Sequence, residues 1–402
     1  MTEIQLAVCQ LIGKALFNSD IPVSGKIDWN EVYYEMSQQT VQGLVINNLK
    51  SIPLPSIVEK KWKKDAIDIM VSVTAVGYAQ MQLDELFERG GISYLIIKGT
   101  SAAINYPNPL LRTVGDVDLY VPTNQLHIAA ELMRKSGYIE NKHDEYNKRH
   151  LSFVRDNVYY ELHKTYATVN GRRSKEYVDG LLDQCCVQES KKNEIGWVRY
   201  TDDYMNFKMP SVSVNGIVLL EHIAHHLMGG LGMKQVLDWL VYVNRELDDE
   251  RWNAFQVMAK KAGLEKLAKV VTRVGQLYFG LSTEIKWCNK VDSQICQEFL
   301  EYVFANGNAG KKRQEIGKIA RVSNKLSGMS NFFINIQRAG EYNWEAYRGH
   351  RWLKPFAGVY QIFRYFRQVI TTPNVLKNFI KGLSEAKKRK KMMEKMGVYI
   401  DK

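Results

Sequence analysis

The stretch Gly115-Asp116-Val117-Asp118-Leu119 alternates acidic and apolar residues, which is typical of a β-strand with one buried face. Residues two apart on a strand point to the same side, so Asp116 and Asp118 are expected side by side while Val117 and Leu119 enter the core. Two adjacent carboxylates repel each other unless a proton or a cation relieves the repulsion. Their hard oxygens favour Mg²⁺ or Mn²⁺. The polar face of an edge strand gives the same pattern, so the pair alone does not decide between the two interpretations.

A second motif lies upstream, where Lys98-Gly99-Thr100-Ser101 follows the apolar run Tyr94-Leu95-Ile96-Ile97. The apolar run predicts a short buried strand. Glycine lets backbone amides approach a phosphate, a helix N-terminus favours an anion, and Lys98 adds a positive charge. The motif therefore predicts a phosphate-binding turn; a strand-to-helix turn capped by Thr or Ser is the alternative.

A third motif lies downstream, where Val158 to His163 alternates apolar and polar residues after the turn Arg155-Asp156-Asn157. With Leu151 to Val154 before that turn, the pattern predicts a hairpin. Glu161 would lie on a polar face and complete a set of three carboxylates for a two-metal site. His163 would share that face, either orienting a carboxylate or contacting substrate, or as an ordinary strand residue.

All of the strand signal lies between residues 91 and 210, and helical periodicity dominates elsewhere. The prediction is an α+β fold: a small mixed β-sheet core flanked by N-terminal and C-terminal helical regions. The expected parts are an N-terminal helical region (1–90), the core (91–210), a helical domain (211–305) and a basic, aromatic-rich helical region (306–402).

Local signals predict where several elements begin and end. A long helix is expected from about Ser56 to Arg89, stopped by Gly90-Gly91. Thr123 is expected to cap the next helix. The basic, polar stretch Gly307 to Gly328 is typical of a linker or mobile loop, and Pro373 is expected to start the last helix.

The charge is unevenly distributed. The chain of 402 residues has a net charge of +12, but residues 306–402 hold 21 Lys and Arg against 6 Asp and Glu, which leaves the first 305 residues slightly acidic. Basic residues interleaved with aromatics suit RNA or another anionic partner. A polybasic helix also suits anionic lipid, or is simply solvated. If the acceptor is RNA, deleting Lys387 to Lys402 is expected to flatten the salt dependence of RNA binding and to leave NTP binding and any self-labelling at the core intact.

Composition excludes several classes of protein. With 45% hydrophobic and 24% charged residues, the chain is neither disordered nor collagen-like. Its five cysteines are odd in number and form no CxxC pair, which argues against a disulfide framework and a cysteine-rich zinc site. The sequence contains no run of about 18 apolar residues, so no membrane-spanning segment is predicted. An acidic Glu3 replaces the positive charge of a signal peptide, so a cytoplasmic location is expected.

Together these motifs resemble the DNA polymerase beta-like nucleotidyltransferase superfamily. The resemblance is strongest to a poorly characterised bacterial branch known as nucleotidyltransferase family proteins, and it covers roughly residues 90–240. The matching elements are Ile97 to Ser101, Tyr106-Pro107, Arg112, Gly115 to Leu119, Glu161-Leu162-His163, Glu221-His222, His225-His226 and Asp238-Trp239.

The resemblance implies a role for each motif. Asp116, Asp118 and Glu161 would be catalytic and would bind two Mg²⁺ or Mn²⁺ ions. Lys98 and the turn Gly99-Thr100-Ser101 would hold the β- and γ-phosphates of an NTP. Further nucleotide-binding and accessory roles would fall to Arg112, as a second phosphate contact, and to His163.

The implied activity is metal-dependent transfer of an NMP from an NTP to an acceptor, with release of pyrophosphate. A tRNA, a protein hydroxyl and a small metabolite all fit as acceptor. The alternative is a nucleic-acid-binding or scaffold protein with a degenerate core, which would need none of the carboxylates. Replacing Asp116 or Asp118 by Asn is expected to abolish transfer while stability stays equal or rises, because like-charge repulsion is relieved.

A group of histidines forms the last candidate site. His222 and His226 lie one helical turn apart, a spacing that suits zinc, but no third ligand is evident. Packing, or hydrogen bonding to Asp238, is the preferred interpretation.

Overall fold

The computed structural model describes residues 1–20, 27–141, 149–188, 197–199, 206–308, 332–371 and 387–399. The chain forms two compact units. The first comprises Met1–Lys311 together with Met396–Ile400, and the second comprises Lys312–Lys395. The regions expected at 1–90, 91–210 and 211–305 all lie in the first unit.

A five-stranded mixed sheet lies in the first unit, with strand order β1-β2-β5-β4-β3. β2 and β5 are parallel, and the other neighbouring pairs are antiparallel. This mixed sheet with its helical flanks confirms the predicted α+β class. The strands are β1 (Leu95–Ile96), β2 (Asp116–Tyr120), β3 (Ile139–Glu140), β4 (His150–Arg155) and β5 (Val158–His163).

The register of β2 and β5 divides the sheet into a polar and an apolar face. Asp118 lies opposite Glu161, and Tyr120 lies opposite His163. In the next pair His163 lies opposite His150. Because side chains alternate along each strand, all of these residues share one face, and the residues between them enter the core.

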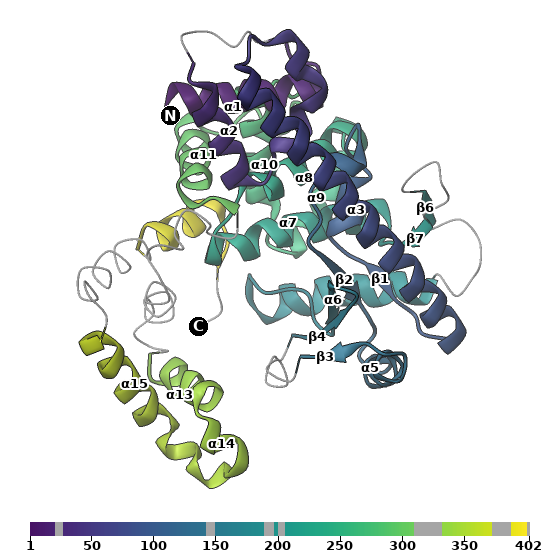
Figure 1. Ribbon diagram of the computed structural model, residues 1–402, viewed down its shortest axis with the longest axis vertical. Coiled ribbons are helices and arrows are strands. Elements are labelled where there is room, and N and C mark those ends of the chain that lie inside the picture. Colours follow the sequence, from purple (N-terminus) through teal and green to yellow (C-terminus); the bar gives the residue numbers. More distant parts are fainter. Residues whose placement is uncertain are drawn as a thin grey trace. The chain divides into compact units, whose positions relative to one another are not determined.

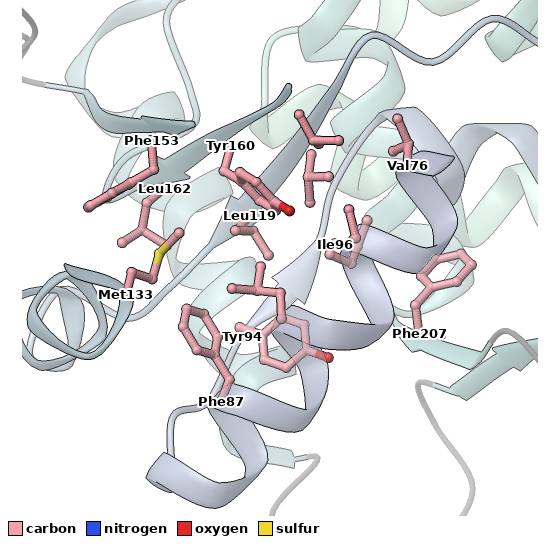
Figure 2. Close-up of a cluster of buried hydrophobic side chains, with 14 of the residues drawn as sticks. Val76, Phe87, Tyr94, Ile96, Leu119, Met133, Phe153, Tyr160, Leu162 and Phe207 are labelled. Carbon is pink, nitrogen blue, oxygen red and sulfur yellow. The ribbon is translucent and has the colours of Figure 1, made fainter. Parts of the chain in front are cut away.

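Two helices cover the apolar face of the sheet: α3 (Ser56–Gly90) and α5 (Leu126–Lys135). Figure 2 shows Val76 and Phe87 of α3 and Met133 of α5 packed on Leu119 and Tyr160. α3 ends where predicted, because Gly91 adopts the left-handed conformation (φ 63°) that favours glycine. This core fixes the orientation of β2 and β5, so the opposite face of the sheet is held in place.

The prediction that Thr123 caps α5 is wrong. The helix begins at Leu126, and Gln125 occupies the cap position without a side-chain hydrogen bond. The amide of Gln125 donates to the carbonyl of Pro122 at 2.8 Å, so a turn over residues 122–125 precedes the helix and takes up the position expected for its first turn.

Most of the remaining helices of the first unit, among them α1, α2, α7, α10 and α11, lie above the sheet in the view of Figure 1. A short hairpin of β6 and β7 was not predicted, and its Phe207 joins the core beneath the sheet. Within the part of the chain that the structure describes, no helix is long and apolar enough to cross a membrane. All five cysteines are buried and free. The remaining elements of the first unit are α1 (Glu3–Phe17), α2 (Trp29–Gln39), η1 (Gln42–Ser51), α4 (Gly99–Ala103), η2 (Pro109–Leu111), α6 (Gly171–Gln188), β6 (Trp197–Arg199), β7 (Asn206–Lys208), α7 (Val212–Gly229), α8 (Met233–Glu246), α9 (Asp249–Lys261), α10 (Glu265–Val274), η4 (Gly275–Phe279) and α11 (Ser293–Asn306).

The second unit is helical where it is described. α13 and α15 run side by side (Figure 1). Most of the expected linker at Gly307 to Gly328, and the expected helix start at Pro373, lie outside the described residues, while residues 387–396 are helical. The elements are α13 (Phe332–Asn343), α14 (Glu345–Gly349), η7 (Arg351–Phe356) and α15 (Ala357–Thr371).

Candidate active site

A pocket of about 350 Å³ opens over the polar face of β2 and β5. Its walls carry both signs of charge, together with five of the eight histidines of the chain. The lining residues are Lys98, Gly99, Arg112, Gly115, Asp116, Asp118, Arg149, His150, Glu161, His163, Tyr166, Glu221, His222, His225, His226, Lys234, Gln235 and Asn308.

The three predicted carboxylates meet in this pocket. Asp116 and Asp118 come from β2, and Glu161 comes from the parallel neighbour β5. One ligand oxygen from each lies within 4.8 Å of the other two. The parallel pairing explains the convergence, because it places Asp118 and Glu161 in register on the same face. Three hard oxygen donors at this spacing fit Mg²⁺ or Mn²⁺.

Two donors bind one oxygen of Asp118. Lys98 Nζ lies 2.7 Å and His163 Nε2 lies 2.8 Å from Asp118 Oδ1. Burial alone would raise the pKa of Asp118, but the charges and hydrogen bonds of Lys98 and His163 outweigh burial and hold that pKa below its ordinary range. Among the described residues both contacts use Oδ1, which leaves Oδ2 for a cation.

The surroundings of Asp116 shift its pKa in the opposite direction. The charge of Asp118, followed by burial, raises the pKa of Asp116 to about 6. The two neighbouring carboxylates therefore differ in the ease with which they ionise, as expected for like charges at close range. A divalent cation between them would remove this penalty, so the chemistry of the donor set fits a metal site.

His163 links two of the carboxylates. Its Nε2 lies 2.8 Å from Asp118 Oδ1 and 3.3 Å from Glu161 Oε2, so we assign the proton to Nε2. Its Nδ1 is buried and has no hydrogen-bond partner within the described ranges. His150 Nε2 lies 3.7 Å from Glu161 Oε1, and His150, Glu161 and His163 form a second group with ligand spacing. His163 thus contacts two of the carboxylates, and its role in orienting them stays a prediction.

The turn after β1 leads directly into the short helix α4. Lys98 and Gly99 line the pocket, and both have positive φ angles, 58° and 40°. Thr100 and Ser101 are buried: the Thr100 hydroxyl donates to Gln80 Oε1 at 3.0 Å, and the Ser101 hydroxyl donates to the Lys98 carbonyl at 2.8 Å. Neither side chain lines the pocket, and these contacts hold the turn in place; phosphate binding by Lys98 and the turn stays a prediction.

Arg112 is held in a buried ion pair. Its Nε and Nη2 donate to the two oxygens of Asp238, at 3.0 and 2.5 Å, and Tyr106 donates to the same carboxylate at 2.9 Å. Of the two roles expected for the histidines, packing fits better than a hydrogen bond to Asp238, because His222 and His226 line the pocket and their rings meet edge to face, 4.7 Å apart. A phosphate contact by Arg112 stays a prediction, and its charge is already balanced by Asp238.

Two basic residues that line the pocket, Lys234 and Arg149, received no role in the sequence analysis. Lys234 from α8 lines the pocket, and burial, followed by the charge of Arg112, lowers its pKa to about 8. Arg149, which precedes β4, lies 3.4 Å from His225 Nδ1. No sequence signal pointed to either cation, because each lies far along the chain from the motifs that it faces.

Glu221 is the fourth carboxylate of the pocket and is 2% exposed. Its Oε1 accepts hydrogen bonds from the amide and hydroxyl of Thr168 and from the amide of Val169. Burial raises its pKa to about 7, even though these hydrogen bonds oppose the rise. The family pattern contained Glu221, but no role was assigned to it.

Comparison with known proteins agrees with this geometry. Residues 25–280 match the model of a family described as uncharacterised nucleotidyltransferase. The match reaches beyond the expected 90–240 on both sides, and it includes α3, the sheet, α7 and α8. No curated protein and no solved structure matches the chain. Because the family model spans more than half of the sequence and contains every residue of the carboxylate site, the chain belongs to the uncharacterised nucleotidyltransferase family.

Proposed function

We propose that this protein transfers an NMP from an NTP to an acceptor hydroxyl, and that a divalent metal held by Asp116, Asp118 and Glu161 supports the reaction. The observation that carries the proposal is the meeting of three carboxylates on paired parallel strands in one pocket. When bound, Mg²⁺ or Mn²⁺ would polarise the α-phosphate and stabilise the pyrophosphate that leaves.

The protein's own cations would bind the triphosphate. Lys98, Arg149 and Lys234 all line the pocket that holds the carboxylates. A bound polyphosphate would offset the burial that now lowers the pKa of Lys234. With nucleotide bound, Lys98 would divide its hydrogen bonds between Asp118 Oδ1 and a phosphate oxygen.

His163 would act as a positioning residue. It donates from Nε2 to Asp118 and Glu161. Such a hydrogen bond would fix the direction of each carboxylate, as the hydrogen-bond partners of metal-binding side chains do in metal sites. The acceptor stays open among a tRNA, a protein hydroxyl and a small metabolite.

The test is a labelling experiment. The purified chain is incubated with each α-³²P-labelled NTP and Mg²⁺, with and without total RNA or cell lysate, and the labelled product is identified. Wild-type protein should transfer label, and Asp116→Asn should not. The matched control is Asp156→Asn, an exposed carboxylate in the β4–β5 turn, which should keep full activity. Equal transfer by wild type and Asp116→Asn would refute the proposal.

A binding measurement tests the phosphate role of Lys98 separately. Lys98→Ala should weaken the affinity for a non-hydrolysable NTP by about 1–3 kcal/mol, the scale of one charge-assisted contact. Calorimetric titration measures this directly. An unchanged affinity would limit Lys98 to its contact with Asp118.

A further inference from the structure

Five large apolar side chains of the second unit are exposed in a regular series, which we call the apolar stripe: Trp352, Phe356, Val359, Phe363 and Phe366. Their exposed fractions lie between 54% and 75%. They are spaced alternately four and three residues apart, through η7 and along α15. On a helix this spacing places side chains on one face.

The opposite face of α15 packs on α13 with small and polar residues. Ala357 and Gln361 are buried. Asn343 Nδ2 donates to Gln361 Oε1 at 3.0 Å, and a Cβ on Gly340 would collide with the Ala357 carbonyl. α15 thus buries its small and polar side and leaves its large apolar side exposed, the reverse of an ordinary amphipathic helix in a globular core.

The charge around the stripe has one sign. Between Glu345 and Glu385 the sequence has no acidic residue and seven basic ones. Lys354 and Arg367 are exposed, and Arg364 is half-buried. An occupant of this surface must therefore offer an apolar layer together with negative charge.

We propose that the apolar stripe docks the protein on an anionic lipid surface, with Phe363 and its neighbours in the headgroup–acyl boundary and the Lys and Arg side chains on lipid phosphates. A helix with an aromatic apolar face and cationic flanks lies in the plane of a membrane interface in this way. The shape of the side chains favours lipid over RNA. Val359 in the stripe and the neighbouring Ile362, which is 38% exposed, have no flat ring to stack on a base, whereas acyl chains accept aliphatic and aromatic groups alike.

Vesicle flotation of the full chain tests the proposal. One set of vesicles is pure phosphatidylcholine, and the other carries about one-third phosphatidylglycerol to supply negative charge. The protein should float with the anionic vesicles at least tenfold more strongly than with the neutral ones. Added salt should weaken the binding without abolishing it, because the apolar contribution is not screened.

A matched pair of variants shows whether the stripe is responsible. Val359→Asp places a charge in the stripe, and Val71→Asp places one on α3 of the first unit. The two valines are 63% and 65% exposed, so neither variant should perturb folding. Val359→Asp should lower anionic vesicle binding about tenfold or more, and Val71→Asp should leave it unchanged.

Several results would overturn the proposal. These are a lack of vesicle binding by the wild type, equal binding to neutral and anionic vesicles, and equal effects of the two variants. RNA binding that Val359→Asp abolishes, without vesicle binding, would assign the stripe to RNA. A wild-type dimer that Val359→Asp dissociates, again without vesicle binding, would assign it to a second copy of the chain.

Discussion

At the scale of single residues, Asp116 and Asp118 differ more than their positions in one short strand suggest. Asp118 is bound by Lys98 and His163, whereas the charge of Asp118 raises the pKa of Asp116. We therefore keep the prediction of equal or higher stability for the Asp116 variant and revise it for the Asp118 variant, because the loss of Asp118 would leave the charge of Lys98, whose side chain is only 14% exposed, without this partner.

We expect Asp116→Asn to match or exceed the wild type in free energy of unfolding at pH 8, and Asp118→Asn to lose roughly 3 kcal/mol, the scale of breaking a buried ion pair from one side. Urea unfolding of the three proteins without divalent metal checks this. Equal losses in both variants would contradict the asymmetry. Adding Mn²⁺ should then raise the melting temperature of the wild type more than that of Asp116→Asn.

Glu221 gives a prediction on pH. Its pKa is raised to about 7 by burial, from an ordinary value near 4.5. The folded state therefore binds the extra proton more tightly than the unfolded state does. The stability that this proton contributes is fully present below about pH 4.5 and is lost as the pH rises through about 7.

Glu221→Gln keeps an oxygen that accepts from Thr168 and Val169 but cannot ionise. We expect it to be as stable as the wild type near pH 4.5 and more stable at pH 8, by up to about 3 kcal/mol. The measurement is urea unfolding at both pH values. A constant difference between the two proteins across this range would show that Glu221 does not titrate there.

Sequence reasoning found the residues whose positions follow from strand periodicity. Asp116, Asp118, Glu161 and His163 were placed on shared faces because side chains alternate along a strand, and the structure has them so. The buried positions of the Thr100 and Ser101 side chains were not predicted, because the direction of a side chain after a turn depends on its tertiary partners, Gln80 and Asn215.

At the scale of elements, α7 brings Glu221 and three histidines to the pocket because it packs closely on its neighbours. Gly216 makes this approach possible. A Cβ there would lie 2.5 Å from the Tyr242 hydroxyl oxygen and 2.8 Å from Phe255 Cε2. Both aromatic rings are buried, so neither can move aside easily.

We expect Gly216→Ala to destabilise the protein by about 1–3 kcal/mol through overpacking. Gly180→Ala is the matched control: it lies within α6, nothing would come within 4 Å of its Cβ, and alanine is the better helix former. That variant should gain about 0.5–1 kcal/mol. Thermal unfolding of both variants decides; a loss of similar size in both would point to the backbone rather than to packing.

Elements with long periodic patterns were predicted well. α3 was expected from about Ser56 to Arg89 and ends at Gly90, since its pattern is long and a glycine follows it. The hairpin of β6 and β7 was missed, because strands of three residues carry too little pattern to detect. The predicted start of α5 was wrong because the residues that favour a turn also favour a helix cap.

At the scale of the whole molecule, the last residues return to the first unit. The amide of Asn170 donates to the Tyr399 carbonyl at 2.7 Å, and the amide of Tyr399 donates to Asn170 Oδ1 at 2.8 Å. Met396 and Val398 are buried. Deleting Lys387 to Lys402 would therefore also remove five residues of the unit that holds the pocket, and we revise the expectation that NTP binding survives this deletion.

We expect a chain that ends after Lys395 to lose about 3 kcal/mol of stability in the first unit, on the scale of emptying the space of buried apolar side chains. A chain that ends after Ile400 is the control and should behave as the wild type does. Thermal unfolding of both forms provides the measurement. An unchanged melting temperature in the shorter chain would show that the Asn170–Tyr399 contacts add nothing.

Because residues 396–400 belong to the first unit, the second unit is an insertion that is connected to the first at both of its ends. The conformational entropy of the inserted chain then links the stability of the two units. If the second unit melts, the contacts of Tyr399 must close a loop of more than 80 residues. The closure entropy grows as the logarithm of loop length and amounts to about 4 kcal/mol at this size. The hydrogen bonds between Asn170 and Tyr399 and the burial of Met396 and Val398 barely match that cost. Melting of the second unit should therefore release residues 396–400, and the backbone amide of Asn170 should then exchange its hydrogen with solvent.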